Sequence, residues 1–185
     1  MIKYDEGEKN MVNGSVLRFM ATYVEEKKGI SGKEEFQKKV NERNVIIPKV
    51  DAIDPDDEFS NGYFERVFDA TAKVLNDDKL LSQFGFNYGK RFSSPSMRIF
   101  SAIEKNQKIV DLVCEDLKRY IPTFSVNCES LSDKKFVIRI GNIKSKEQSL
   151  FVSGYLDALF QKVQKKIVKS EENQGEQKKI VLKFL

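Results

Sequence analysis

The chain has 185 residues, of which 40% are hydrophobic and 32% charged, with a net charge of +4. This length can bury one sizeable core, and the composition is that of a folded protein rather than a disordered one. No apolar run approaches the roughly 18 residues that a membrane-spanning helix needs, so we expect no membrane span. The chain has no histidine. This removes the commonest general base, the commonest metal ligand and the usual haem-iron ligand.

The cysteines and lysines give no sign of a special chemistry. Cys114 and Cys128 are too few for a disulfide framework and lie in no metal-binding cluster, so we expect a reduced, cytoplasmic protein. The aromatic residues are not interleaved with basic ones, so no nucleic-acid partner is expected. A solvated surface is the simpler interpretation of the one lysine cluster, although it could also contact an anionic surface: Lys162, Lys165, Lys166 and Lys169.

The first part of the chain shows helical periodicity. Apolar residues between Val16 and Val24 predict an amphipathic helix that ends at Gly29, and a capping box at Ser31–Glu34 begins a second helix. The acidic stretch 46–62 is expected to be an irregular loop. It lacks the central glycine and the twelfth-position glutamate of a calcium-binding loop, so its acids are interpreted as helix caps.

Further helices are expected from 63 to 75 and from Asp77 or Asp78 through residue 92. Ser94-Pro95 is a typical start for the next helix, whose periodicity continues, with a break near Asn106, until Pro122.

The second half changes to the alternation of β-strands, at 124–128 and 135–140. Ser145 and Gln148 then form a capping-box pattern that opens a helix, and two final strands flank a turn at Gly175. We therefore predict a single α+β domain over residues 1–185. Its helical half, about 12–121, packs beside a sheet half, about 123–185, that holds a four-stranded antiparallel sheet with one intervening helix.

The stretch FGFNYGKRF, residues 84–92, superficially resembles a phosphate-binding loop. Such a loop follows a strand, whereas these glycines lie in a predicted helix, one residue too close together and followed by Arg91. Gly85 and Gly89 are four apart and are interpreted as a helix-packing face. The adjacent aromatic stripe of Phe84, Tyr88 and Phe92 fits either core packing or the lining of a ligand cavity.

The same stretch resembles the G-[aromatic]-N-x-G-x-[RK] helix of the small subunits of TRAPP vesicle-tethering complexes, and a related helix of 4-vinyl-reductase domains. NGSVLRFMATYVEEKKG resembles the first helix of haem nitric-oxide-binding (H-NOX) domains, and VSGYLDALFQKVQKKIV resembles the penultimate helix and following strand of all three groups. The resemblance spans about Val12 to Phe184. It implies a helical half beside a four-stranded antiparallel sheet.

The departures from the H-NOX pattern concern haem. An H-NOX domain holds haem through a histidine in the helix before the first strand of the sheet, where this chain has KIVDLVCEDLKRY. Cys114 in that stretch is either a thiolate ligand or, more simply, a buried structural cysteine. The Tyr-x-Ser-x-Arg clamp on the haem propionates is replaced by Asn142, Lys144 and Lys146. Haem is therefore disfavoured, and no cofactor is expected.

The resemblance implies a non-enzymatic, haem-free sensor or regulatory domain that binds a small apolar or amphipathic molecule, with a protein partner or a homodimer. An alternative is a ligand-free adaptor that dimerises through its helices, as tethering subunits do. An enzyme would need an unrecognised carboxylate or cysteine site. Lys144 and Lys146 are the expected anion contacts at the cavity mouth. The expected cavity lining is Phe92, Phe100, Ile103, Phe124, Phe151 and Tyr155.

Overall fold

The computed structural model describes residues 11–42, 49, 52–93, 105–121, 123–163 and 165–185. The chain divides into two compact units, Met1–Asp77 and Asp78–Leu185. The division falls between the expected third and fourth helices, so the expected helical half contributes to both units. Each unit is described by itself below, and the single-domain assignment stays a prediction.

The described part of the first unit is built on the helices α1 (Gly14–Asn41) and α2 (Asn61–Leu75). Gly29 interrupts α1 with a φ of 72°, in the left-handed region that glycine adopts most easily, and it kinks the helix there. This is the predicted helix end, although helical structure resumes directly after it. The buried apolar faces of the two helices include Leu17, Met20, Val24, Phe64, Val67, Phe68 and Leu75.

A small two-stranded sheet and the acidic loop support the start of α1. Strands β1 (Met11–Asn13) and β2 (Glu58–Ser60) pair antiparallel, and their three-residue length explains why no alternation predicted them. The backbone N–H groups of Gly14 and Ser15 donate to the carbonyl oxygens of Asp57 and Pro55, at 2.7 and 2.9 Å. The loop therefore caps α1 through main-chain carbonyls rather than through its carboxylates.

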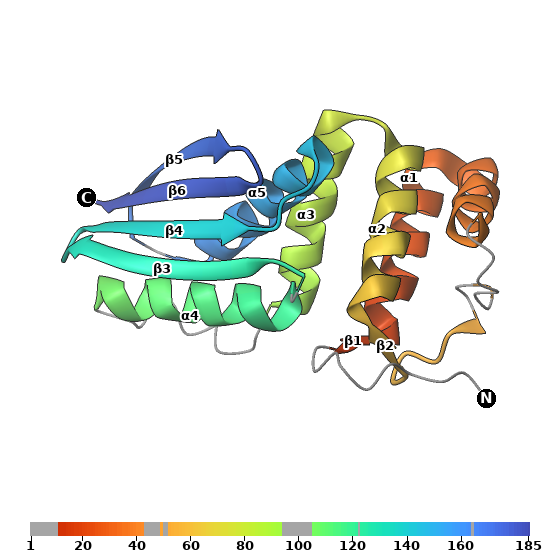
Figure 1. Cartoon of the computed structure of the whole chain (residues 1–185), viewed down its shortest axis with the longest axis horizontal. Helices are drawn as coiled ribbons and strands as arrows, with labels where there is room; N and C mark the ends of the chain where they lie inside the picture. The colour runs from red at the N-terminus through yellow and green to blue at the C-terminus, as the bar shows by residue number, and fades with distance from the viewer. Residues whose placement is uncertain (1–10, 43–48, 50–51, 94–104, 122, 164) are drawn as a thin grey trace. The chain divides into compact units, whose positions relative to one another are not determined.

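In its described residues, the second unit has three helices and a four-stranded sheet (Figure 1). The strands form an antiparallel sheet in the order β3-β4-β6-β5. This confirms the predicted α+β class, with one helix between the two strand pairs. The predicted helix start at Ser94-Pro95 lies outside the described residues. The elements are α3 (Asp78–Phe92), α4 (Asn106–Tyr120), β3 (Ser125–Ser132), β4 (Lys135–Gly141), α5 (Lys146–Gln161), β5 (Ile167–Gln174) and β6 (Gln177–Phe184).

The capping box predicted before α5 forms in part. The Ser145 hydroxyl accepts from the backbone N–H of Gln148 at 3.2 Å, while the Gln148 side chain accepts from the N–H of Lys144 instead of Ser145. This fixes where α5 begins.

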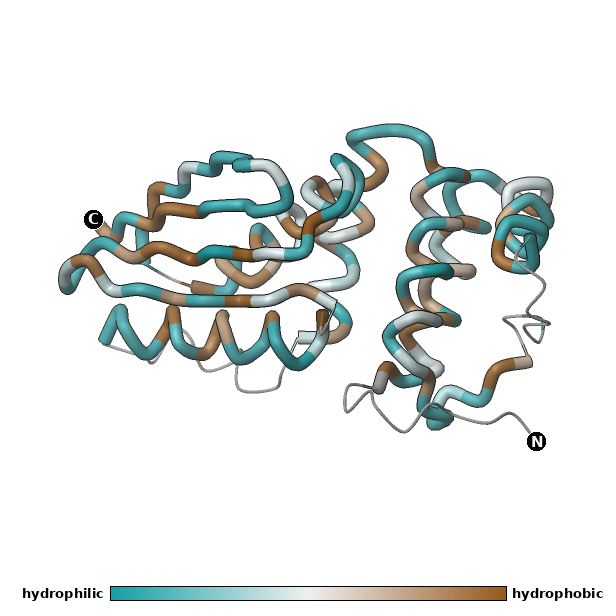
Figure 2. Tube along the Cα trace, in the orientation of Figure 1, coloured by the Kyte–Doolittle hydropathy of each residue, from teal (hydrophilic) through white to brown (hydrophobic). Residues whose placement is uncertain are grey.

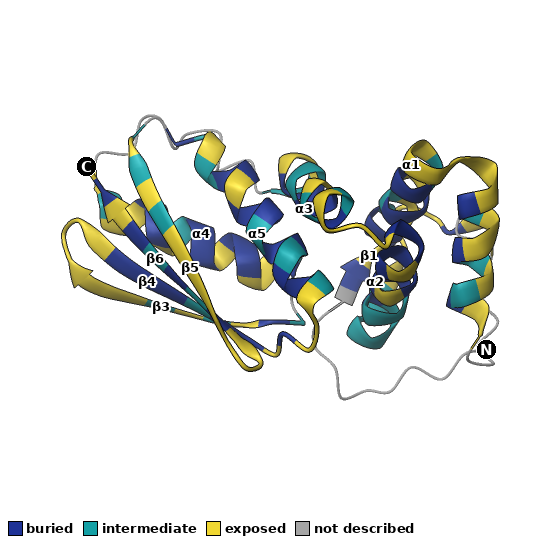
Figure 3. Ribbon diagram, turned by 90° about the horizontal axis from the view of Figure 1, so that it is seen from above, coloured by how far each residue is buried: buried dark blue, intermediate teal, exposed yellow. Residues whose placement is uncertain are grey.

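Both α4 and α5 cover the same face of the sheet, as the view from above shows (Figure 3). The strand register explains which strands each helix covers. Cys128, Ile138, Ile180 and Glu171 are successive neighbours in one row across the four strands, so their side chains share a face. Cys128 at one end of the row bonds to α4, and Glu171 at the other end contacts α5.

Runs of apolar residues, brown in Figure 2, lie along the two inner strands β4 and β6, and burial selects alternate residues of β6. In β6, Lys178, Ile180, Leu182 and Phe184 are buried, while the residues between them are not. Burying each large apolar side chain stabilises the fold by roughly 1.5–3 kcal/mol. Among the described residues, no helix is long and apolar enough to span a membrane.

Candidate functional site

Helices α3 and α5 approach each other so closely that three glycines form their contact. A Cβ atom built on Gly85 would lie 2.0 Å from the carbonyl oxygen of Phe151, and one on Gly154 would lie 1.9 Å from that of Ser82. A Cβ on Gly89 would meet Tyr155 at 2.9 Å. The two backbones therefore touch, and any larger residue at Gly85 or Gly154 would force them apart. We call this contact the glycine seam.

Aromatic rings fill the space beside the glycine seam. Tyr88 is fully buried, and its ring centroid lies 4.8 Å from Phe92, 5.3 Å from Phe151 and 5.9 Å from Tyr155. Phe84 contacts Phe151 at 5.2 Å. Rings at such separations attract one another beyond their burial. The aromatic stripe of α3 is thus part of a packed cluster.

Two buried hydroxyls tie this cluster to α4. The Tyr155 hydroxyl donates to Asp116 Oδ2 at 2.6 Å, and the Tyr88 hydroxyl donates to the carbonyl oxygen of Tyr120 at 2.8 Å. Burial raises the pKa of both tyrosines above the usual 10, and the nearby Asp116 raises the pKa of Tyr155 further. Both phenols therefore stay protonated and act as hydrogen-bond donors.

Cys114 on α4 and Cys128 on β3 form a disulfide. The prediction of two reduced cysteines is wrong for this structure. Periodicity places Cys114 on the buried face of α4 and Cys128 on the inner face of the sheet, and packing of the helix on β3 brings their Cα atoms to 6.6 Å. The bond leaves neither sulfur as a thiolate.

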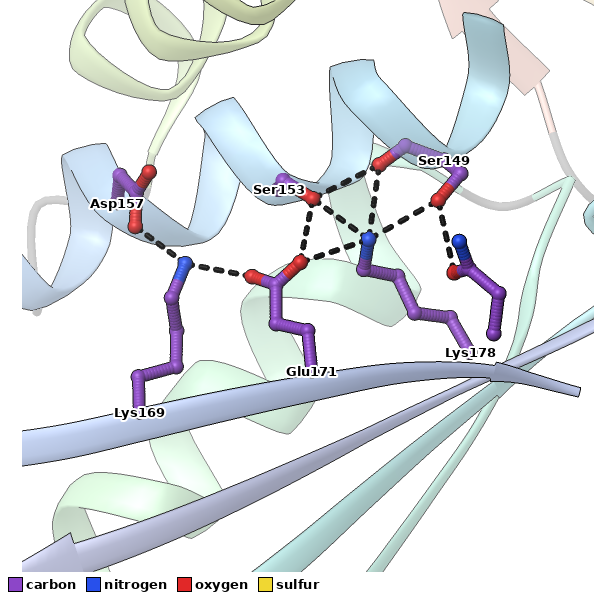
Figure 4. A network of polar contacts seen from close by, with 7 residues as sticks. Ser149, Ser153, Asp157, Lys169, Glu171 and Lys178 are labelled. Atoms are coloured by element: carbon purple, nitrogen blue, oxygen red, sulfur yellow. Dashed lines mark hydrogen bonds and ion pairs between the residues drawn. The ribbon is translucent and has the colours of Figure 1, made fainter. Parts of the chain in front are cut away.

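A polar network joins α5 to β5 and β6 (Figure 4). Its centre is Lys178, whose side chain is only 4% exposed. The ammonium lies 2.6 Å from Ser153 Oγ, 2.9 Å from Ser149 Oγ and 2.7 Å from Glu171 Oε2. These contacts supply the partners that a buried ammonium needs.

Glu171 extends the network to a second lysine. Lys169 contacts Glu171 at 2.6 Å and also pairs with Asp157 on α5. Burial raises the pKa of Glu171, but hydrogen bonds from Lys169, Lys178 and Ser153 outweigh it and hold that pKa at about 2. The carboxylate is therefore charged at neutral pH. The arrangement can pin α5 to the sheet.

The structure brings together three of the residues predicted to line a cavity. Phe92, Phe151 and Tyr155 all surround Tyr88. Phe124 is buried in the link between α4 and β3. The remaining two, Phe100 and Ile103, lie outside the described residues.

The two lysines predicted at the cavity mouth are exposed. The ammonium of Lys146 pairs with Asp78 at 2.5 Å, and this hydrogen bond raises the pKa of Lys146. Lys146 is thereby directed to the start of α3. The backbone N–H of Lys144 donates to Gln148, and Asn142 adopts a left-handed φ of 64°.

The lysine cluster singled out in the sequence is largely engaged in contacts. Lys162 donates to Ser93, and Lys165 donates to Asn106 at 2.9 Å. Lys169 belongs to the Glu171 network. Among the described residues, Lys166 is the one lysine of the four whose side chain has no partner.

A hollow of about 350 Å³ lies beside the N-terminal end of α4. This volume lies within the range of small-molecule sites in proteins. It is lined by five polar or charged residues and one phenylalanine: Lys105, Asn106, Gln107, Ser130, Asp133 and Phe136.

Sequence reasoning missed Asp116 and Lys178, although a signal existed for each. Asp116 falls seven residues after Ile109 on the buried face of a helix, and Lys178 alternates with Ile180 and Leu182 on the inner face of a strand. The sequence predicts neither burial, because charged residues are rarely buried without a partner and the partner is visible only in three dimensions.

The comparisons with known proteins support the fold. No protein-family model matches the sequence, and neither does any curated protein. Among solved structures, the unliganded Fe(II) H-NOX protein from K. algicida is 10% identical, with a TM-score of 0.64 over 94% of this chain and 97% of that one. The Fe(II)NO H-NOX protein from S. oneidensis is 13% identical, with a TM-score of 0.61 over 94% and 99%. A mutant of the T. tengcongensis H-NOX protein is 15% identical, with a TM-score of 0.59 over 94% and 97%. The chain therefore has an H-NOX-like fold.

Proposed function

We propose that this protein is a haem-free, non-enzymatic sensor or regulatory domain that binds a small molecule. One observation carries the proposal: an H-NOX-like fold extends over 94% of the chain, while the chain has no histidine to hold a haem iron. A fold hosts many functions, so the proposal depends on the residues below as well as on the likeness.

The available side chains do not fit a haem held in the H-NOX manner. Helix α4, which precedes the first strand of the four-stranded sheet, offers Cys114 as its only sulfur, and that sulfur is bonded to Cys128. A thiolate ligand would require the disulfide to be reduced. Lys146, at the end of the region expected to clamp propionates, is paired with Asp78. These contacts support a domain that works without haem.

The non-enzymatic part of the proposal is supported by the state of the polar network. Ser153 and Lys178 have the residue types of a serine–lysine catalytic pair, at 2.6 Å. The ammonium of Lys178 is also held in an ion pair with the carboxylate of Glu171, at 2.7 Å. This contact favours a structural role.

Two places are candidates for the ligand. The sequence predicts the aromatic cluster around Tyr88, where a ligand would have to displace packed rings. The hollow lined by Lys105, Ser130 and Phe136 requires no such displacement, and its volume suits a small amphipathic molecule with an anionic group near Lys105.

Native mass spectrometry of the gently purified protein tests the proposal. We expect a mass in excess of the bare chain that disappears on denaturation. The excess should be lost in Ser130→Phe if the ligand occupies the hollow, and in Phe92→Ala if it occupies the aromatic cluster. A bare chain that also gains no thermal stability from any compound in a metabolite panel would overturn the proposal.

A ligand-free adaptor is the second candidate, favoured by the glycine seam. The contact at Gly85 and Gly154 leaves no gap between α3 and α5, and the neighbouring rings are packed. If the protein is an adaptor, we expect a dimer or a complex with another protein, and a chain mass with no small molecule added. Sedimentation velocity combined with native mass spectrometry separates the two functions.

A further inference from the structure

The face of the sheet opposite α4 and α5 carries an unusual group of side chains at one end. Lys135 on β4 lies directly opposite Lys183 on β6, which in turn lies opposite Val168 on β5. The turn residue Lys134 and the link residue Lys166 join this end through main-chain hydrogen bonds to β6 and the C-terminal residue, at 2.9 and 3.0 Å. Leu131 lies at the irregularity of β3, next to Ser132, which is opposite Lys135. We call these six residues the lysine end; they are Leu131, Lys134, Lys135, Lys166, Val168 and Lys183.

The β3–β4 turn and the end of β6 lie at the same end of the sheet (Figure 1). The lysine end is therefore no wider than the four strands of the sheet. Neighbouring strands are about 4.8 Å apart, so the four strands bring these side chains within roughly 15 Å of one another. Their charges therefore act together on anything that approaches this end.

The other end of the same outer face provides an internal contrast. There Arg139 pairs with Glu129 at 2.5 Å, and Lys179 pairs across strands with Glu172 at 3.8 Å. Within the part of the chain that the structure describes, the four lysines of the lysine end form no ion pair. Two like charges directly opposite each other on adjacent strands are destabilising. Among the described residues, the cations at one end of the face are thus paired with acids, whereas those of the lysine end form no such pair.

Two aliphatic side chains stand among these lysines. Leu131 is 50% exposed and Val168 is 51% exposed, whereas most large apolar residues of the described chain are buried. Lysine stems are themselves aliphatic and can lie along apolar surface while the ammonium reaches outward. The lysine end therefore offers hydrocarbon and positive charge together, the combination typical of surfaces that insert at a membrane interface.

We propose that the lysine end binds the surface of an anionic lipid bilayer. The lysines approach the headgroups, and Leu131 and Val168 enter the boundary between headgroups and acyl chains. Such binding is peripheral and requires no spanning helix.

The observations favour lipid over nucleic acid. Sheet surfaces that bind single-stranded RNA or DNA use exposed aromatic rings on which bases stack. The two phenylalanines nearest the lysine end, Phe136 and Phe184, are 1% and 2% exposed and point to the inner face. The exposed side chains at the lysine end are aliphatic, and these suit acyl chains better than bases.

Co-sedimentation with vesicles tests the proposal on the full chain. The probes are vesicles of phosphatidylcholine alone and of phosphatidylcholine with phosphatidylserine. We expect binding only to the second, weakening as salt rises. Replacing both Lys135 and Lys183 by alanine should weaken it about 25-fold, because each lysine near an anionic surface contributes about fivefold. The matched control replaces Lys79 and Lys118, which are exposed elsewhere in the same unit and change the net charge equally.

A second variant tests the aliphatic contribution without changing charge. Leu131→Ser with Val168→Ser should weaken vesicle binding about tenfold. All substituted side chains are at the surface, and circular dichroism verifies the fold of each variant. Equal losses in the Lys79/Lys118 control, no preference for phosphatidylserine, or binding to RNA that exceeds binding to vesicles would each overturn the proposal.

Discussion

Replacing Gly85 by alanine should destabilise the second unit, although glycine-to-alanine changes inside helices usually stabilise. The usual gain is about 1 kcal/mol. Here the added Cβ would lie 2.0 Å from the carbonyl oxygen of Phe151 and 2.9 Å from its Cα. These are backbone atoms that cannot rotate away, so α3 and α5 must separate by roughly 1 Å or more to restore ordinary van der Waals contact.

The separation also loosens the ring contacts beside the glycine seam. Overpacking of this kind costs about 1–3 kcal/mol, and Phe84 and Tyr88 lose part of their contact with Phe151. Allowing for the helix-propensity gain, we expect a net loss of about 2 kcal/mol. Such a loss would lower the urea midpoint by about 1 M for a unit of this size.

A graded series makes the test specific. Gly154→Ala should match Gly85→Ala, because its Cβ would lie 1.9 Å from the Ser82 carbonyl oxygen, and Gly89→Ala should cost less, with its nearest contact at 2.9 Å. Gly62→Ala on α2 is the control, since its nearest neighbour is a hydroxyl at 3.9 Å, and it should be neutral or slightly stabilising. Urea unfolding followed by circular dichroism measures all four. If Gly85→Ala were as stable as Gly62→Ala, the helices would not be in backbone contact.

Three further predictions concern the contacts between α4, α5 and the sheet. Reducing the disulfide, or replacing Cys114 and Cys128 by serine, should lower the free energy of unfolding by about 3 kcal/mol for a loop of this length; an unchanged urea midpoint with and without reductant would count against the bond. Glu171 has a pKa lowered from 4.5 to about 2, so its contribution to stability is complete above pH 4.5 and is lost as the pH falls toward 2. Discounted for solvent screening, this contribution to the free energy of unfolding is about 1–2 kcal/mol. The variant Glu171→Gln should therefore lose less stability than the unmodified protein when the pH falls from 4.5 to 2. Tyr155→Phe should lower the free energy of unfolding by about 1–3 kcal/mol because it removes a hydrogen bond to a buried carboxylate. Tyr88→Phe removes a hydrogen bond to a main-chain carbonyl and should cost about 1 kcal/mol, and an equal loss in both would contradict the assignment.

Much of the fold was predictable because local signals and tertiary contacts agree. Ser145 caps α5 as expected, and the alternation of Phe136, Ile138 and Ile140 identified the inner face of β4. Gly85 and Gly89 stand four residues apart, and the structure places both against α5. In each case the residues that carry the signal are neighbours along the helix or strand.

The candidate site was less predictable because its contacts join residues distant in sequence. The bond between Cys114 and Cys128 depends on α4 lying over β3, which neither segment reveals alone. Lys178 is followed by a second lysine and preceded by polar residues, so composition suggests a surface position. Its burial is tolerable only because Glu171 reaches it from the neighbouring strand β5 and Ser153 reaches it from α5.

Adding hemin to the purified protein tests the central claim most directly. The protein, in oxidised and reduced form, is mixed with hemin, desalted, and examined by absorbance spectroscopy. Because the chain has no histidine and Cys114 is bonded to Cys128, we predict that no haem remains bound in the oxidised protein and that no histidine-ligated spectrum appears in either form. Stoichiometric haem that survives desalting of the oxidised protein, with a spectrum of axially ligated iron, would contradict the account.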